Sequence, residues 1–206
     1  MADWLHEFDA SYRFMRVDRA TGAEVSELEG FETGGSISRN LDTDVYESAS
    51  ATCEGGLDVG ADLVRVYLDA DFGGEVERVA LGTFVPSVPK RDVSGEVDRA
   101  SVSMQGRLSE LAEDAFDAPF SLPAGSDPVA EAAAICRACG LAVSADASAY
   151  RLSTAWTFGL SETSDGEGGS KLRAVNALLG IAGFASAVTD PMGTVLMRRY
   201  AEPEAR

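Results

Sequence analysis

Hydrophobic and polar positions divide the chain into two parts with different periods. From about residue 12 to residue 106, short runs of alternating apolar and polar residues are broken by turn residues, and no segment has a helical period. Two pairs of runs predict β-hairpins: residues 12–18 with 23–28, and residues 62–69 with 75–85. Residues 98–106 predict a further strand. We expect these strands to form a small barrel or a sandwich rather than an open sheet, because their edges need to be closed or covered.

Helical signals begin after this part of the chain. Residues 108–113 predict one or two helical turns, and the prolines and glycine that follow, up to residue 125, predict a connector. Ser126 or Asp127 can cap a helix that has Pro128 in its first turn and ends at Cys139, before Gly140.

The last 40 residues predict a second helix and a hairpin. Ser170 caps the helix, and its apolar positions fall on one stripe: Leu172, Val175, Leu178 and Leu179. We expect this stripe to pack on a C-terminal β-hairpin made by residues 185–189 and 194–200. The predicted fold class is therefore α+β, with an N-terminal all-β, barrel-like domain over residues 1–118 and a smaller α/β domain over residues 119–206, with two helices and a C-terminal β-hairpin.

The net charge of the chain restricts the partners that it can bind. The chain has 17 Lys and Arg against 34 Asp and Glu, a formal net charge of −17. Non-specific binding to nucleic acid depends on Lys and Arg that neutralise phosphates, so the negative net charge excludes it. The same charge disfavours binding to anionic membranes. No basic segment followed by an apolar run stands at the N-terminus, and no apolar run approaches the ~20 residues of a membrane span. We expect a protein made and kept soluble in a cytoplasm.

Candidate catalytic and metal-binding groups are few. The single histidine, His6, stands near the N-terminus, where a catalytic group is rarely held in place. Cys136 and Cys139 form a C-x-x-C inside the predicted helix, without a second pair, and we interpret them, with Cys53, as reduced packing residues. Asp69 and Asp71 could ligate calcium through oxygen donors, but the further spaced carboxylates of a calcium loop are missing, which favours a hairpin turn.

The remaining acidic residues and glycines give no stronger signal. The carboxylates that a glycosidase would need are spread over turns and amphipathic faces: Glu7, Asp9, Asp42, Asp44, Glu110, Glu113 and Asp114. The glycine-rich stretches at residues 34–36 and 166–170 lack phosphate-binding spacing. We predict no catalytic, cofactor-binding or metal-binding residue, no cofactor, and no enzyme activity.

Several motifs resemble one family of viral proteins. They are Leu81-Gly82-Thr83-Phe84 with its following proline turn, the strand and leucines of residues 102–111, the link Phe120-Ser121-Leu122-Pro123-Ala124-Gly125, and Lys171-Leu172-Arg173-Ala174-Val175-Asn176-Ala177-Leu178-Leu179 before a hairpin. Together, from about residue 31 to residue 204, they resemble hub-type minor tail proteins of siphophages and prophages. This sequence departs from the family pattern at Gly106-Arg107-Leu108, where the family often has an aspartate before the first leucine.

The resemblance implies a structural component of the baseplate hub, at the tail tip of a virion assembled in a bacterial cytoplasm. Such a hub is a ring of copies, commonly three, that joins the tail tube to distal tail, tape-measure and fibre proteins. The resemblance leaves open whether this chain is a complete short hub protein, one piece of a split hub, or an N-terminal portion. An acidic ring lumen would repel DNA during ejection.

Two other functions stay open. A carbohydrate or receptor-binding module of the tail would need clustered exposed aromatic residues, and only Trp4 and Trp156 are available as tryptophans. A tail-associated peptidoglycan hydrolase would need a constellation that the single histidine disfavours. For contacts with neighbours, the polar loop of residues 161–169 and the turn of residues 71–74 are candidates, against the alternative that both are solvated loops.

Overall fold

The structure is a computed structural model that describes residues 4–5, 7–32, 34–54, 59–87, 90–94, 97–159 and 169–201. The chain groups into two compact units. The first comprises Met1–Asn40, Tyr46–Gly106 and Pro191–Gly193, and the second comprises Leu41–Val45, Arg107–Asp190 and Thr194–Arg206. The division into domains of residues 1–118 and 119–206 stays a prediction.

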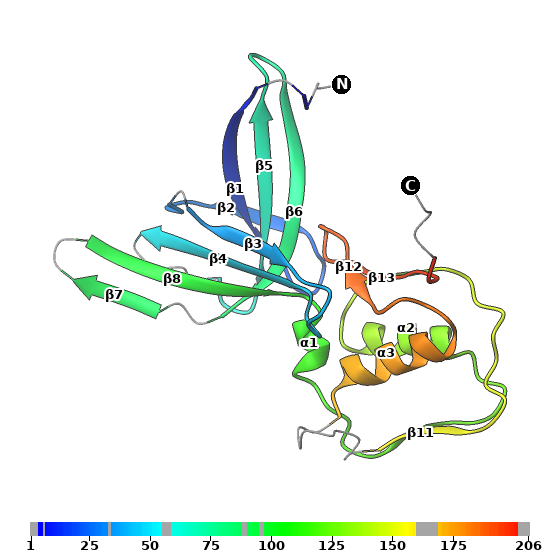
Figure 1. The fold of residues 1–206 in the computed structure, drawn as a ribbon. Coiled ribbons are helices and arrows are strands. Elements are labelled where there is room, and N and C mark those ends of the chain that lie inside the picture. The colour runs from blue at the N-terminus through cyan, green and yellow to red at the C-terminus, as the bar shows by residue number, and fades with distance from the viewer. Residues whose placement is uncertain are drawn as a thin grey trace. The chain divides into compact units, whose positions relative to one another are not determined.

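The first unit is built from one eight-stranded sheet. Its strands are β1 (Asp9–Val17), β2 (Glu24–Leu28), β3 (Ser36–Arg39), β4 (Glu47–Glu54), β5 (Leu63–Asp71), β6 (Val76–Pro86), β7 (Lys90–Ser94) and β8 (Val97–Gly106). The strand order is β2-β1-β5-β6-β8-β4-β3, and β7 pairs with β8 beside this path (Figure 1). All the pairs in this sheet are antiparallel.

Both predicted hairpins of this part are confirmed, because β1 pairs with β2 and β5 pairs with β6. Turn chemistry explains them. Asp18 accepts hydrogen bonds from the backbone and hydroxyl of Thr21, and Gly22 takes a positive φ of 71°. In the second hairpin, Gly73 and Gly74 have φ of 85° and 125°, which is a conformation that favours glycine.

The predicted barrel is wrong as a closed structure. Strands β6 and β8 pair only where Phe84–Pro86 meets Met104–Gly106, and from there β1, β5 and β6 diverge from β3, β4 and β8 as two arms (Figure 1). Beyond Pro86, the Ser87 N–H still donates to the Ser103 carbonyl at 2.8 Å, and β7 continues the pairing with β8. On the far side, the described residues show one isolated bridge, between Phe31 and Cys53, and no ladder between β2 and β3. The sheet curls but stays open.

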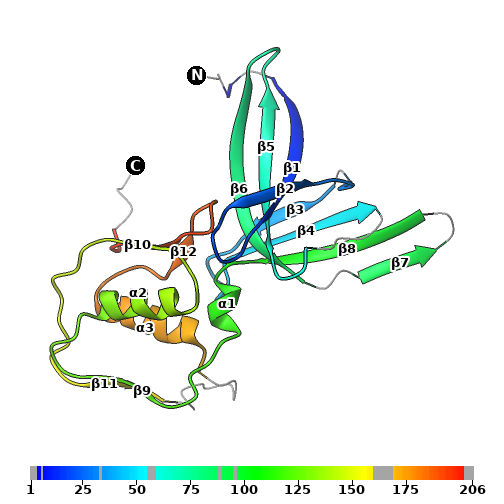
Figure 2. The same ribbon diagram turned by 180° about the vertical axis from the view of Figure 1, so that it is seen from behind.

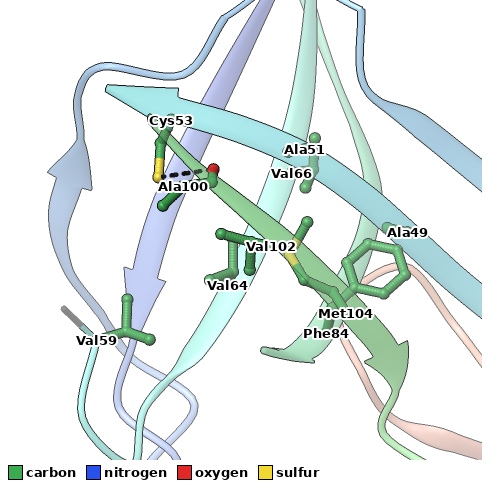
Figure 3. Close-up of a cluster of buried hydrophobic side chains, with 10 residues drawn as sticks. All are labelled: Ala49, Ala51, Cys53, Val59, Val64, Val66, Phe84, Ala100, Val102 and Met104. Atoms are coloured by element: carbon green, nitrogen blue, oxygen red, sulfur yellow. Dashed lines mark hydrogen bonds between the residues drawn. The ribbon is translucent and has the colours of Figure 1, made fainter. Parts of the chain in front are cut away.

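The core of the first unit lies between these arms. Ten buried residues contribute to it: Ala49, Ala51, Cys53, Val59, Val64, Val66, Phe84, Ala100, Val102 and Met104. Figure 3 shows side chains from β4, β5, β6 and β8 in one cluster, with the Cys53 thiol 3.6 Å from the Ala100 carbonyl oxygen. Alternation along each strand sends these apolar side chains to the same face.

The second unit mixes helices with short strands. Its elements are α1 (Ser109–Ala112), β9 (Phe120–Leu122), α2 (Pro128–Ala138), β10 (Val143–Ala145), β11 (Trp156–Phe158), α3 (Lys171–Ile181), β12 (Val188–Thr189) and β13 (Val195–Met197). Strands β12 and β13 form the predicted C-terminal hairpin. Together the two units give the predicted α+β class.

Both long helices begin at the predicted caps. The Asp127 carboxylate accepts from the backbone N–H groups of Val129 and Ala130, and the Ser170 hydroxyl accepts from that of Arg173. Gly140 ends α2 with a φ of 78°. Within the described residues, no helix has the length and apolar character that a membrane span requires.

The apolar stripe of α3 is buried, as predicted, but its main partner differs. Helix α3 packs against α2, as both views show, and also against α1 (Figure 2). The expected hairpin is linked to it through Asn176, whose side-chain oxygen accepts from the Ala187 N–H at 3.0 Å. Two pairings were not predicted: β9 with β11, and β10 parallel to β13.

Candidate interaction surface

The C-x-x-C cysteines lie at the end of α2. Cys136 is buried and Cys139 is half-buried, and both are free thiols. Burial raises the pKa of Cys136 to about 12 and also raises the pKa of Cys139, whose thiol lies 3.5 Å from Asp114 Oδ2. A reactive thiolate requires a lowered pKa, so this environment favours the packing interpretation. The described residues hold no group of three or more His, Cys, Asp and Glu placed for a metal ion.

Two of the acidic residues considered for sugar chemistry, Asp114 and Glu110, are held by separate cations. Lys171 Nζ lies 2.5 Å from Asp114 Oδ2, and this hydrogen bond lowers the pKa of Asp114. Arg107 Nε lies 2.8 Å from Glu110 Oε2, three residues along the chain. The structure therefore gives these carboxylates local ion-pair partners, and it does not bring them together as a catalytic pair.

The candidate calcium ligands Asp69 and Asp71 are occupied by the protein itself. Asp69 accepts from Arg78 Nε at 2.6 Å, from Arg78 Nη2 at 2.9 Å and from Arg13 Nε at 3.1 Å. The hydrogen bonds from Arg78, and then those from Arg13, lower the pKa of Asp69. Asp71 Oδ1 accepts from the backbone of Gly73 and Gly74, both at 2.9 Å. These contacts build the hairpin.

One face of the β1–β5–β6 arm carries a polar network that the sequence did not reveal. Alternation predicts that Arg65 faces solvent, yet this side chain is only 4% exposed. It donates to Thr83 Oγ1 at 2.9 Å, to Glu24 Oε1 at 3.1 Å and to the Met192 carbonyl at 3.2 Å. These acceptors are 18, 41 and 127 residues away in the chain, so no local signal announces them.

The opposite face of this arm is apolar and lines a groove of about 390 Å³. Tyr12 and Phe14 alternate with Arg13 along β1, and so point away from the polar network. We define the groove by six of its lining residues: Tyr12, Phe14, Ile37, Ala49, Leu81 and Met104. Its volume falls within the ~300–1,000 Å³ of typical binding pockets.

Small residues before β3 and on β4 line the groove, and Gly35 allows the chain to pass close to the β4 backbone. Gly34 has a φ of 112°, in the range that favours glycine. At Gly35, a Cβ atom would lie 2.8 Å from the Ser50 carbonyl oxygen, closer than real Cβ atoms come. The glycines at residues 34–35 and the serine–alanine alternation of β4 were the available sequence signal.

Aromatic side chains gather at the far end of the same arm. The ring centroids of Trp4, Phe8 and Phe72 lie 5.3–5.5 Å apart in all three pairs. Leu5 and Val76 beside them are 94% and 58% exposed, and Trp4 is also exposed. We call these five residues the apolar tip. Phe72 comes from the turn of residues 71–74, which was predicted as a contact site.

The other positions that the sequence predicted contribute less to a candidate interaction surface. Residues 160–168, most of the predicted polar loop, and His6 lie outside the described residues. Trp156 is half-buried on β11 with its ring centroid 6.0 Å from that of Phe158. It is in the second unit, whereas Trp4 is in the first.

Comparisons with known proteins give a likeness of fold. No protein-family model and no curated protein matches the sequence. A solved structure of the 43 kDa tail protein of prophage MuSo2 from Shewanella oneidensis is 14% identical, with a TM-score of 0.58 over 97% of this chain and 55% of that one. A tail protein from Neisseria meningitidis MC58 is 14% identical, with a TM-score of 0.58 over 90% of this chain and 50% of that one.

A third similar structure is a PdpA–VgrG complex, which is 8% identical with a TM-score of 0.52 over 93% of this chain and 35% of that one. This chain therefore spans about half the length, or less, of the structures that it resembles. The likeness covers both units of the chain.

Proposed function

We propose that this protein is a structural component of a phage or prophage tail, at the baseplate hub. The observation that supports the proposal is the fold, which is shared over nearly the whole chain with two prophage or bacterial tail proteins. The sequence motifs, found independently in the order expected of hub proteins, support the same function.

The surface of the first unit suits assembly better than catalysis. It offers an open sheet with strand edges at β2 and β3, an apolar groove, and an exposed apolar tip. Exposed strand edges and apolar patches are features through which subunits associate. We infer a non-catalytic protein that forms a ring, commonly of three copies, and contacts distal tail, tape-measure and fibre proteins.

The location of the protein on the particle tests this function. Antibody against this chain is applied to intact and to detergent-stripped particles, and the label is located by electron microscopy. Label at the end of the tail tube, exposed only after stripping, is expected. An absence of label on both preparations, with the chain also missing from purified particles by mass spectrometry, would refute the tail function.

A receptor-binding module is the second candidate, because the apolar tip does place exposed aromatic and aliphatic side chains together. The same experiment separates it from a hub. A receptor-binding protein would label the outer fibres of intact particles without any stripping.

A further inference from the structure

We draw no further inference here: the strongest candidate, the side-chain cluster of Asp114, Cys139 and Lys171 beside the ends of α1 and α2 and the first turn of α3, outside the candidate interaction surface, carries no binding or modification site, because the Asp114 carboxylate already accepts from both neighbours, and because burial raises the pKa of the Cys139 thiol and the hydrogen bond to Asp114 raises the pKa of Lys171, which keeps both groups protonated and unreactive at neutral pH.

Discussion

Phe84 offers the sharpest test of how the first unit is held together. Its ring is 0% exposed and lies in the core cluster where the two arms meet. The substitution Phe84→Ala removes apolar burial equivalent to about 2–3 kcal/mol. A residual cavity of roughly 80 Å³, at about 24 cal/mol per Å³, adds about 2 kcal/mol. We expect a total loss of about 4 kcal/mol, a large part of the ~5–15 kcal/mol that stabilises a typical protein.

Urea unfolding followed by far-UV circular dichroism measures this loss, and amide hydrogen exchange in β4 and β8 locates it. The matched control is Phe72→Ala, the same change at the half-buried tip, where we expect about 1 kcal/mol or less. Phe84→Ala should therefore loosen the core, whereas Phe72→Ala should leave the core intact. Equal losses of stability in the two variants would refute the assignment of Phe84 to the core.

Three further predictions concern packing, pH and thiol reactivity. Gly82→Ala should destabilise the protein in the same urea assay, because the new Cβ would lie 2.5 Å from a buried core ring. Gly180→Ala has open space on α3 and should stabilise the protein by up to about 1 kcal/mol. The reverse order of stabilities would contradict the packing described. The folded-state pKa of Asp69 is lowered, so its stabilisation is present above the unfolded pKa of about 3.9 and is lost as pH falls through the folded value. The difference in unfolding free energy between wild type and Asp69→Asn should therefore shrink below about pH 4, and a difference that does not depend on pH would disprove this role. Iodoacetamide at mildly alkaline pH should modify Cys139 before Cys136 in the folded protein, as read by mass spectrometry. Cys136 should react more slowly because it is more deeply buried and its pKa is raised to about 12. Equal rates of modification would argue against the burial of the Cys136 thiol.

Local chemistry determined the elements that the sequence predicted correctly. The carboxylate of Asp127 and the hydroxyl of Ser170 cap the helices that follow them, because each accepts from backbone N–H groups only two or three residues away. The turns at residues 19–22 and 71–74 join strands that are neighbours in the chain. Such interactions need no distant partner, and residue pattern alone is sufficient to predict them.

Tertiary structure decided what depends on segments far apart in the chain. The sheet remains open because no ladder joins its end strands β2 and β3 among the described residues, and the contact between Phe31 and Cys53 is a single bridge. Arg65 is buried because its acceptors come from residues 24, 83 and 192, and the groove is lined by residues from separate segments of the chain. Each of these arrangements costs the conformational entropy of closing a long loop, and packing between distant segments offsets that cost. Alternation along one strand cannot specify such packing. The sequence by itself therefore determined the hairpins, the helices and their caps, whereas the open edge, the buried network and the groove arose only when distant strands met.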